Sequence, residues 1–190
     1  METEVRKIHV MCDLETLGKA PGCKIVSIGA VEFSSAGLGH EFYMEVTRDF
    51  QGTLNEDPST LEWWAAQPSE VRDRLFEHDA RRPFLSSALF DFNEWLVSLS
   101  TQSQGGPAEI ALWGNGATFD NSILRYAYTA VGGPKEPAWP WFNDFCYRTL
   151  KNLRLDVQLE RTSPKHHALC DAKYQALHAI ELMKAIGVWV

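Results

Sequence analysis

Residues 8–18 read IHVMCDLETLG, a short apolar run followed by two acidic residues. The apolar and β-branched residues from Ile8 to Cys12 predict a buried β-strand. Asp13 and Glu15 are two positions apart, so their side chains leave the end of this strand on the same face and can bind one cation together. Because strand ends are often acidic where they enter solvent, the pair alone does not define a site.

Two further runs extend this strand into a three-stranded antiparallel unit. Lys24–Phe33 is rich in β-branched residues, and Gly39–Val46 alternates apolar with polar residues. The turn-like stretch GKAPG at residues 18–22 separates the first two strands. A fourth, brief strand is predicted at Glu109–Trp113.

Helical periodicity and helix-boundary residues predict six helices. These are Pro58–Trp64, Ser69–Phe76, Leu85–Leu99, Thr118–Val131, Asp144–Leu153 and Ala168–Ile186. The polar segment Ser100–Pro107 and the proline-rich segment Pro134–Pro140 are predicted connectors. Three antiparallel strands followed by alternating strand and helices predict an α/β fold, with a mixed sheet and helices on its faces.

The overall composition indicates a single domain over residues 1–190, because 45% of the residues are hydrophobic and 12% are aromatic. No apolar run is long enough for a membrane span, and the charged first residues resemble no signal peptide. We therefore expect a soluble, cytoplasmic protein without a membrane partner. The net charge of −7 argues against a protein that coats nucleic acid, but not against an enzyme whose metal ions mask carboxylates.

Two more acidic residues are predicted at the starts of helices, where the helix dipole favours negative charge. Asp120 follows the strand break at Gly114-Asn-Gly116, and Asp171 lies in the first turn of the last helix. The four carboxylates would then meet at one edge of the sheet. An all-oxygen set of ligands suits Mg²⁺ or Mn²⁺ better than zinc, and the four cysteines form no CxxC pair.

Two adjacent histidines, His166 and His167, precede Asp171. On a continuous helix, residues five apart lie about 140° from each other, so a role for His166 beside Asp171 requires a loop. Ser163-Pro164 predicts such a mobile loop, because proline resists a helix that continues from before it. A histidine on this loop can act as a general base, and His167 is the competing candidate.

Three motifs contain these residues: Asp13-Leu-Glu15-Thr-Leu-Gly18, Asn115-Gly-Ala-Thr-Phe119-Asp120 and His166-His-Ala168-Leu169-Cys-Asp171-Ala172. Together they resemble the DEDDh branch of the DnaQ-like, or proofreading, 3′–5′ exonuclease superfamily. In that family the motif histidine lies five positions before the last aspartate, which selects His166. The second motif departs from the commonest family form, which has His-Asn where this chain has Gly114-Asn115.

The resemblance implies a ribonuclease H-like fold, with a mixed five-stranded central sheet flanked by helices. It also implies metal-dependent 3′-to-5′ hydrolysis that releases nucleoside 5′-monophosphates, from single-stranded DNA in the first place and from RNA as the alternative. Two ions, Mg²⁺ or Mn²⁺, are implied in each active site. Asp13, Glu15 and Asp171 would hold one ion and the attacking water, Asp13 and Asp120 would hold the other, and His166 would accept the proton of the water.

The first two motifs also imply contacts with the substrate. In the family the first motif meets the terminal nucleotide, which implies contacts from Leu14, Thr16 and Leu17, with Leu17 as the side chain that wedges between bases. Asn115 and Phe119 of the second motif are further candidate substrate-binding residues, and the Phe119 ring can stack on a base.

Candidate substrate contacts outside the motifs are two tryptophans and three basic residues. Trp63 and Trp64 can stack on bases, with core packing as the alternative. Their surroundings, and those of Arg148 and Lys151, are similar to a subgroup of phage and bacterial exonucleases, of which some act on DNA and others on RNA. Arg148, Lys151 and Lys165 are candidates for binding backbone phosphates.

Three alternatives remain from the sequence. An aspartyl phosphatase would show Asp-x-Asp in place of Asp13-Leu-Glu15. A non-catalytic nucleic-acid-binding module on the same fold would be expected to have lost a metal ligand. An exoribonuclease would differ from a DNA exonuclease in its contacts with the 2′-hydroxyl. The apolar end Val188-Trp189-Val190 is compatible with a homodimer.

Overall fold

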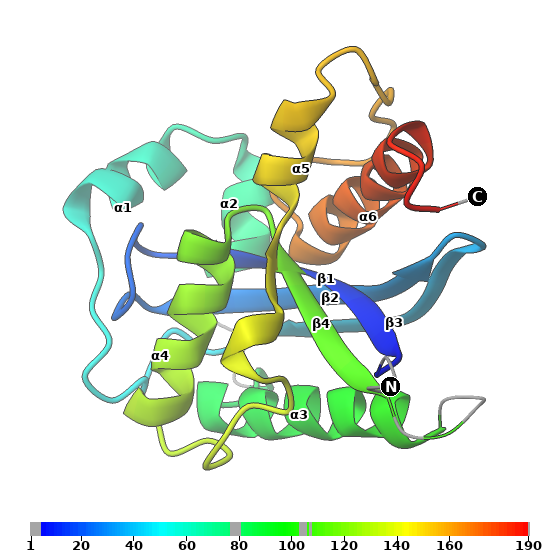
Figure 1. Ribbon diagram of the computed structural model, residues 1–190. Helices are drawn as coiled ribbons and strands as arrows, with labels where there is room; N and C mark the ends of the chain where they lie inside the picture. The colour runs from blue at the N-terminus through cyan, green and yellow to red at the C-terminus, as the bar shows by residue number, and fades with distance from the viewer. Residues whose placement is uncertain (1–4, 77–80, 103–105, 107, 190) are drawn as a thin grey trace.

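A mixed five-stranded sheet forms the centre of the computed structural model, which describes residues 5–76, 81–102, 106 and 108–189 (Figure 1). The strands are β1 (Lys7–Thr16), β2 (Ile25–Ser34), β3 (Gly37–Glu45), β4 (Glu109–Gly114) and β5 (Asp144–Cys146), in the order β3-β2-β1-β4-β5. The first three strands pair antiparallel, whereas β4 is parallel to β1 and β5 is parallel to β4. The predicted mixed five-stranded sheet is confirmed.

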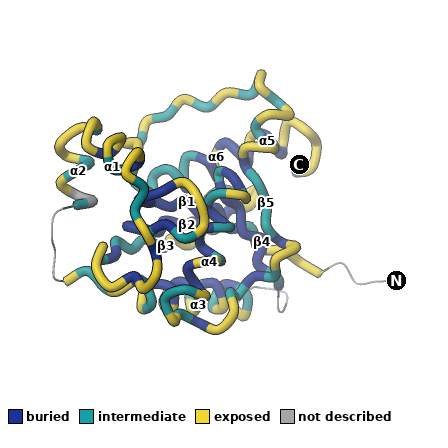
Figure 2. The backbone as a smooth tube through the Cα atoms, turned by 90° about the vertical axis from the view of Figure 1, so that its left-hand side faces the viewer, coloured by how far each residue is buried: buried dark blue, intermediate teal, exposed yellow. Residues whose placement is uncertain are grey.

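In the part of the chain that the structure describes, six α-helices surround this sheet: α1 (Pro58–Ala65), α2 (Ser69–Phe76), α3 (Leu85–Gln102), α4 (Ser122–Ala130), α5 (Tyr147–Leu153) and α6 (Ala168–Ala185). In Figure 1, α6 crosses one face of the sheet and α3 lies on the other. The buried positions gather in the strands and in the helix faces turned toward them (Figure 2). Within the described ranges, no helix combines the length and the hydropathy needed to cross a lipid bilayer.

Alternate residues of β1 divide between two hydrophobic clusters. Val10, Cys12 and Leu14 belong to the cluster that includes residues of α3 and α4. Met11 belongs to the other cluster, with residues of α6. Because successive side chains of a strand point to opposite faces, Asp13 lies on the same side as Met11, toward α6.

The predicted helix Asp144–Leu153 is wrong at its start. Asp144–Cys146 form the edge strand β5, and the helix begins only at Tyr147. The Asp144 carboxylate accepts hydrogen bonds from Asn121, Arg125 and Trp139 at 2.8–3.1 Å, which hold this short segment extended beside β4. Three residues are too few to show a strand period in the sequence.

Smaller differences concern the ends of elements. β1 continues beyond Cys12 to Thr16, so the acidic residues lie within the strand and not after it. The predicted helix Thr118–Val131 begins as a π-helical turn at Ala117–Asn121, followed by α4. Part of the predicted connector Ser100–Pro107 lies outside the described residues, as does Val190 of the apolar C-terminus.

Candidate active site

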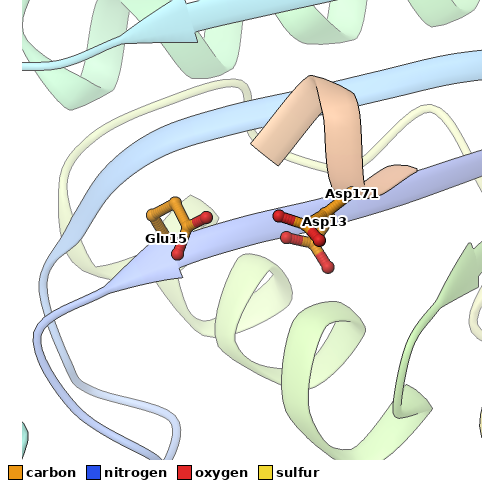
Figure 3. Close-up of side chains that lie close together, drawn as sticks. All are labelled: Asp13, Glu15 and Asp171. Atoms are coloured by element: carbon orange, nitrogen blue, oxygen red, sulfur yellow. The ribbon is translucent and has the colours of Figure 1, made fainter. Parts of the chain in front are cut away.

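Three carboxylates converge where β1 passes beneath the start of α6 (Figure 3). One oxygen atom each from Asp13, Glu15 and Asp171 lie within 4.8 Å of one another. Asp13 and Glu15 are buried, and the side chain of Asp171 is 15% exposed. The cluster offers only carboxylate oxygens, which are the ligands that Mg²⁺ and Mn²⁺ prefer.

Gly29 on β2 allows α6 to come this close to the sheet. A Cβ atom at Gly29 would lie 2.1 Å from the backbone nitrogen of Leu169 and 2.2 Å from the carbonyl carbon of Ala168. Gly29 is also the residue that pairs with Asp13 across the β1–β2 ladder. The absence of a side chain at Gly29 therefore allows the first turn of α6, which carries Asp171, to lie over Asp13.

Asp120 approaches the same site from the π-helical turn after β4. Its Oδ1 atom accepts a hydrogen bond from the Leu14 N–H at 3.3 Å, and its Oδ2 atom accepts one from the Gly116 N–H at 3.1 Å. A Cβ atom at Gly114 would lie 2.3 Å from Oδ1 of Asn121. This contact gives a physical reason for glycine where the commonest family form has histidine.

The electrostatics of the site favour a cation. Burial raises the pKa of Asp13 well above its ordinary value, and the neighbouring carboxylates of Asp120, Glu15 and Asp171 raise it further. Burial also raises the pKa of Asp120 to about 6, although its backbone hydrogen bonds oppose the shift. Carboxylates that are costly to ionise together are stabilised by a divalent cation among them. The residues present therefore fit the implied Mg²⁺ or Mn²⁺.

Two residues that the sequence did not indicate contact these carboxylates. Gln175 Nε2 donates to Asp13 Oδ1 at 2.7 Å, and Gln175 Oε1 has no hydrogen-bond partner in the described part of the chain. Arg161 Nη1 lies 2.5 Å from Asp171 Oδ1. Gln175 follows Asp171 by one helical turn, and this spacing is a signal that would have found it. No spacing in the sequence indicates Arg161.

His166 lies just before α6, and its ring faces the two tryptophans of α1. Its centroid is 5.1 Å from that of Trp63 and 5.8 Å from that of Trp64, both edge-on. The backbone of His166 has a φ of 62°, which is in the left-handed region. For a residue other than glycine this conformation costs about 1–2 kcal/mol.

His167 has a different environment from its neighbour. Its ring stacks on Tyr43, with centroids 4.3 Å apart and an interplanar angle of 24°. Its backbone N–H donates to Asp171 Oδ2 at 3.1 Å, at the start of α6. The ring of His167 does not line the cavity described below, whereas His166 does. The two adjacent histidines therefore differ in place: His166 lies at the cavity and His167 lies against Tyr43.

A cavity of about 520 Å³ opens over the carboxylates. Its lining contains the four acidic residues, His166, and seven of the predicted substrate contacts: Leu14, Thr16, Trp63, Trp64, Asn115, Phe119 and Arg148. It also contains Gly18 of the first motif, and residues that the sequence did not indicate: Lys19, Ser59, Thr60 and Gln175. Lys19 and Ser59 are joined by a hydrogen bond of 3.1 Å and have no motif spacing that would have revealed them.

The two tryptophans occupy different positions. Trp64 is 3% exposed, packs with Leu17 and Val26, and donates its indole N–H to the Thr16 carbonyl at 2.9 Å. Trp63 is 45% exposed. The core-packing alternative therefore describes most of Trp64, whereas the ring of Trp63 is accessible to a base.

Leu17, Lys151 and Lys165 are not found at the cavity. Leu17 is fully buried, because its backbone bonds to Lys24 and Asp57 fold the turn inward. It is not placed to act as the predicted wedge, and Leu14 is the leucine of the first motif that lines the cavity. Lys165 is exposed outside the lining, and the Lys151 ammonium lies 5.8 Å from the Tyr147 ring.

Comparison with known protein families gives a match over most of the chain. The family model described as a 3′–5′ exoribonuclease Rv2179c-like domain matches residues 8–183. No curated protein matches the chain significantly.

Three solved structures show the fold. The nuclease domain of 3′hExo, a DEDDh family member bound to rAMP, has a TM-score of 0.63 and 12% identity, with 98% of this chain and 96% of that chain covered. A 3′-exonuclease that recognises the 3′ end of a histone mRNA stem-loop has a TM-score of 0.57 and 14% identity, with coverages of 97% and 84%. Exonuclease I of E. coli with an oligonucleotide has a TM-score of 0.59 and 15% identity, and this chain spans 42% of its length. The predicted ribonuclease H-like fold is confirmed.

Proposed function

Because this chain belongs to the 3′–5′ exoribonuclease Rv2179c-like family, we propose that it removes nucleoside 5′-monophosphates one at a time from the 3′ ends of RNA. Membership makes the chain a 3′–5′ exonuclease, and hence a hydrolase, as the three motifs predict. The sequence favoured single-stranded DNA, with RNA as the alternative. The description of the family as exoribonucleases supports the reverse order.

The observation that carries the proposal is the convergence of Asp13, Glu15 and Asp171 within 4.8 Å, with Asp120 in the same cavity. We propose that the first three residues hold one divalent cation and that Asp13 and Asp120 hold a second. When bound, Mg²⁺ or Mn²⁺ ions supply activation of the attacking water and neutralisation of the leaving 3′-oxygen. The hydrogen bonds from Leu14 and Gly116 orient the Asp120 carboxylate.

His166 is the proposed general base, which accepts the proton of the attacking water. Its ring lines the cavity and is enclosed on one side by the edges of Trp63 and Trp64. These contacts restrict its orientation beside the carboxylates, and carboxylates favour the charged imidazolium that forms when the proton is accepted. His167, stacked on Tyr43, has no part in this step.

The remaining lining of the cavity suits one end of a single strand. Trp63 and Phe119 present aromatic faces on which bases stack, and each well-made stack contributes about 1–3 kcal/mol. Arg148 is exposed in the first turn of α5, and its guanidinium carbon lies 3.7 Å from a Cβ placed at Gly116. Arg148 is therefore proposed to bind a backbone phosphate beside the second motif.

The test uses 5′-labelled single-stranded RNA and DNA of identical sequence, with Mg²⁺, Mn²⁺ or EDTA, and the Asp13→Asn variant as a matched control. The expected result is a ladder of shortened products that requires metal and Asp13 and that forms faster on RNA. Faster shortening of DNA would overturn the substrate preference and leave the chemistry standing. Absence of metal-dependent shortening on either polymer would overturn the proposed mechanism.

Neither a binding module nor a dimer is needed to explain the described residues. All four carboxylates and His166 are present at one cavity, which speaks against a non-catalytic module. The apolar C-terminal Trp189 packs edge-on against His9 and Phe33 of its own chain. The homodimer therefore remains a prediction from sequence alone.

A further inference from the structure

Arg161 lies in the segment between α5 and α6 and forms an ion pair with Asp171, one of the proposed metal ligands. The distance from Nη1 to Asp171 Oδ1 is 2.5 Å, and the two side chains are 18% and 15% exposed. Water and salt screen such a partly buried ion pair less than a pair on the surface. The position of the guanidinium therefore strongly affects the orientation of the Asp171 carboxylate.

The other edges of the same guanidinium hold the loop that leads to His166. Nε donates to the Ser163 carbonyl at 3.0 Å, and Nη2 donates to the Pro164 carbonyl at 2.5 Å. The guanidinium carbon lies 5.1 Å from the centroid of the Tyr174 ring on α6. One planar group thus joins the loop, the helix and the metal ligand, which requires the several fixed donors of arginine.

The backbone of His166 needs such support. Its φ of 62° is strained for a residue other than glycine, and strained residues persist only where the surrounding structure fixes them. Ser163 and Pro164, whose carbonyls Arg161 binds, are three and two residues before His166. Arg161 therefore contacts Asp171 directly. It acts on the proposed general base indirectly, through the backbone of residues 163–166.

We propose that Arg161 is a positioning residue of the active site, which orients Asp171 for cation binding and holds residues 163–166 so that His166 stays in the cavity. The proposal rests on the metal-dependent function proposed above. Residues that hydrogen-bond to metal ligands typically change metal affinity or activity about 10–100-fold when they are removed. Arg161 itself does not line the cavity.

The direction in which metal affinity changes when Arg161 is removed distinguishes this positioning role from one in which Arg161 only neutralises Asp171. If Arg161 only neutralised Asp171 in place of a cation, its removal would leave a more available ligand, and cations would bind more tightly. If Arg161 orients Asp171, its removal leaves a rotating carboxylate and a loosened loop, and cations bind more weakly.

The experiment compares Arg161→Ala and Arg161→Lys with the matched control Arg154→Ala. Arg154 also joins a loop to α6, through Asp156 at 2.7 Å and the Ala185 carbonyl at 2.6 Å, and it does not line the cavity. The dissociation constant of Mn²⁺ is measured by calorimetric titration of metal-stripped protein. The kcat and KM for RNA are measured separately, and circular dichroism confirms folding.

The expected result for Arg161→Ala is Mn²⁺ binding weakened about 10–100-fold and a lower kcat with little change in KM. Arg161→Lys should recover part of the Mn²⁺ affinity, because it keeps the charge and loses the fork of donors. Arg154→Ala should change neither quantity. Unchanged or tighter Mn²⁺ binding by Arg161→Ala, or an equal loss in Arg154→Ala, would overturn the proposal.

If Arg161→Ala does not fold, Arg161→Lys carries the test, and Mn²⁺ binding equal to that of the wild type would overturn the proposal. The Mn²⁺ titration also separates this proposal from the proposed function. A wild-type protein that binds Mn²⁺ without cleaving RNA would contradict the function, while the affinities of the variants would still decide the role of Arg161.

Discussion

The two ends of β1 bury titratable side chains in opposite ways. Near its start, His9 accepts a hydrogen bond from Trp113 Nε1 at 2.9 Å and contacts the rings of Phe33, Phe145 and Trp189. Burial, with a smaller effect of Lys7, lowers the pKa of His9 to about 4, so it is neutral near pH 7. Four residues further on, burial and three neighbouring carboxylates raise the pKa of Asp13.

We infer from this difference that the acidic end of β1, and not the aromatic end, binds a ligand from outside the chain. Around His9, the polar ring nitrogen Nδ1 and the apolar ring surface are satisfied by residues of the same chain, which is how a fold completes a core. Around Asp13, the hydrogen bond that Gln175 donates offsets only a small part of the repulsion from the neighbouring carboxylates. Buried carboxylates that repel one another do not stabilise the fold unless a cation binds between them.

The largest effect is expected when the acidic end loses its central ligand. Asp13→Asn should reduce metal-dependent cleavage on the order of a thousandfold or more, because Asp13 is the proposed ligand shared by both cations. The same change should raise the melting temperature of the metal-free protein, because it removes one repelling charge. Cleavage kinetics and thermal unfolding in EDTA check both, and a lower metal-free melting temperature would contradict the electrostatic account.

Substitutions of the two histidines that precede α6 should have different effects on turnover. His166→Ala should slow turnover about 10²–10⁴-fold and leave Mn²⁺ binding intact, because the proposed base is lost while the ligands remain. His167→Ala should change turnover only a few-fold, since its ring stacks on Tyr43 and its bond to Asp171 comes from the backbone. Single-turnover rates compare the two variants, and a crippled His167→Ala enzyme would reverse the assignment.

The stability of the metal-free protein should depend on pH through the acidic end. The pKa of Asp120 is about 6 in the folded protein against an ordinary 3.8, so its contribution to stability is lost as pH rises through about 6. Saturating Mn²⁺ should restore stability near neutral pH, by about 2.7 kcal/mol at a hundred times the dissociation constant. Unfolding curves with EDTA and with Mn²⁺ measure this, and equal curves near neutral pH would contradict it.

The smallest effect on activity is expected at the aromatic end. His9→Gln keeps an acceptor for Trp113 but cannot be protonated, so cleavage should be unchanged. The folded-state pKa of wild-type His9 is about 4, below the ordinary 6.5, so its contribution to stability is lost as pH falls from 6.5 toward 4. His9→Gln should lose less stability over that range, as thermal unfolding would show. An equal acid loss in both proteins would mean that His9 is not the sensitive group.

The sequence predicted those features that depend on local pattern. The apolar run before Asp13, the strand break before Asp120 and the proline before His166 each have a period or a turn residue that fixes the local backbone. Because β1 and β4 are parallel, their carboxyl ends meet at one edge, and the acidic residues of two distant segments meet with them.

The features that were missed depend on contacts between distant residues. β5 is held extended by side chains of other segments, and the direction of Leu17 is set by packing with Trp64 on α1. The Arg161 side chain reaches Asp171 from a loop without regular structure. Such contacts leave no period in the sequence.

The central claim is that the acidic end of β1 is completed by cations that the chain itself does not supply. Its most direct test is a calorimetric titration of Mn²⁺ into metal-stripped wild-type protein and into Asp13→Asn, with RNA cleavage followed over the same Mn²⁺ concentrations. We expect saturable Mn²⁺ binding by the wild type, with cleavage that rises over the same range of concentrations, and loss of both in the variant. Binding that is unchanged by Asp13→Asn, or cleavage that persists in EDTA, would contradict it.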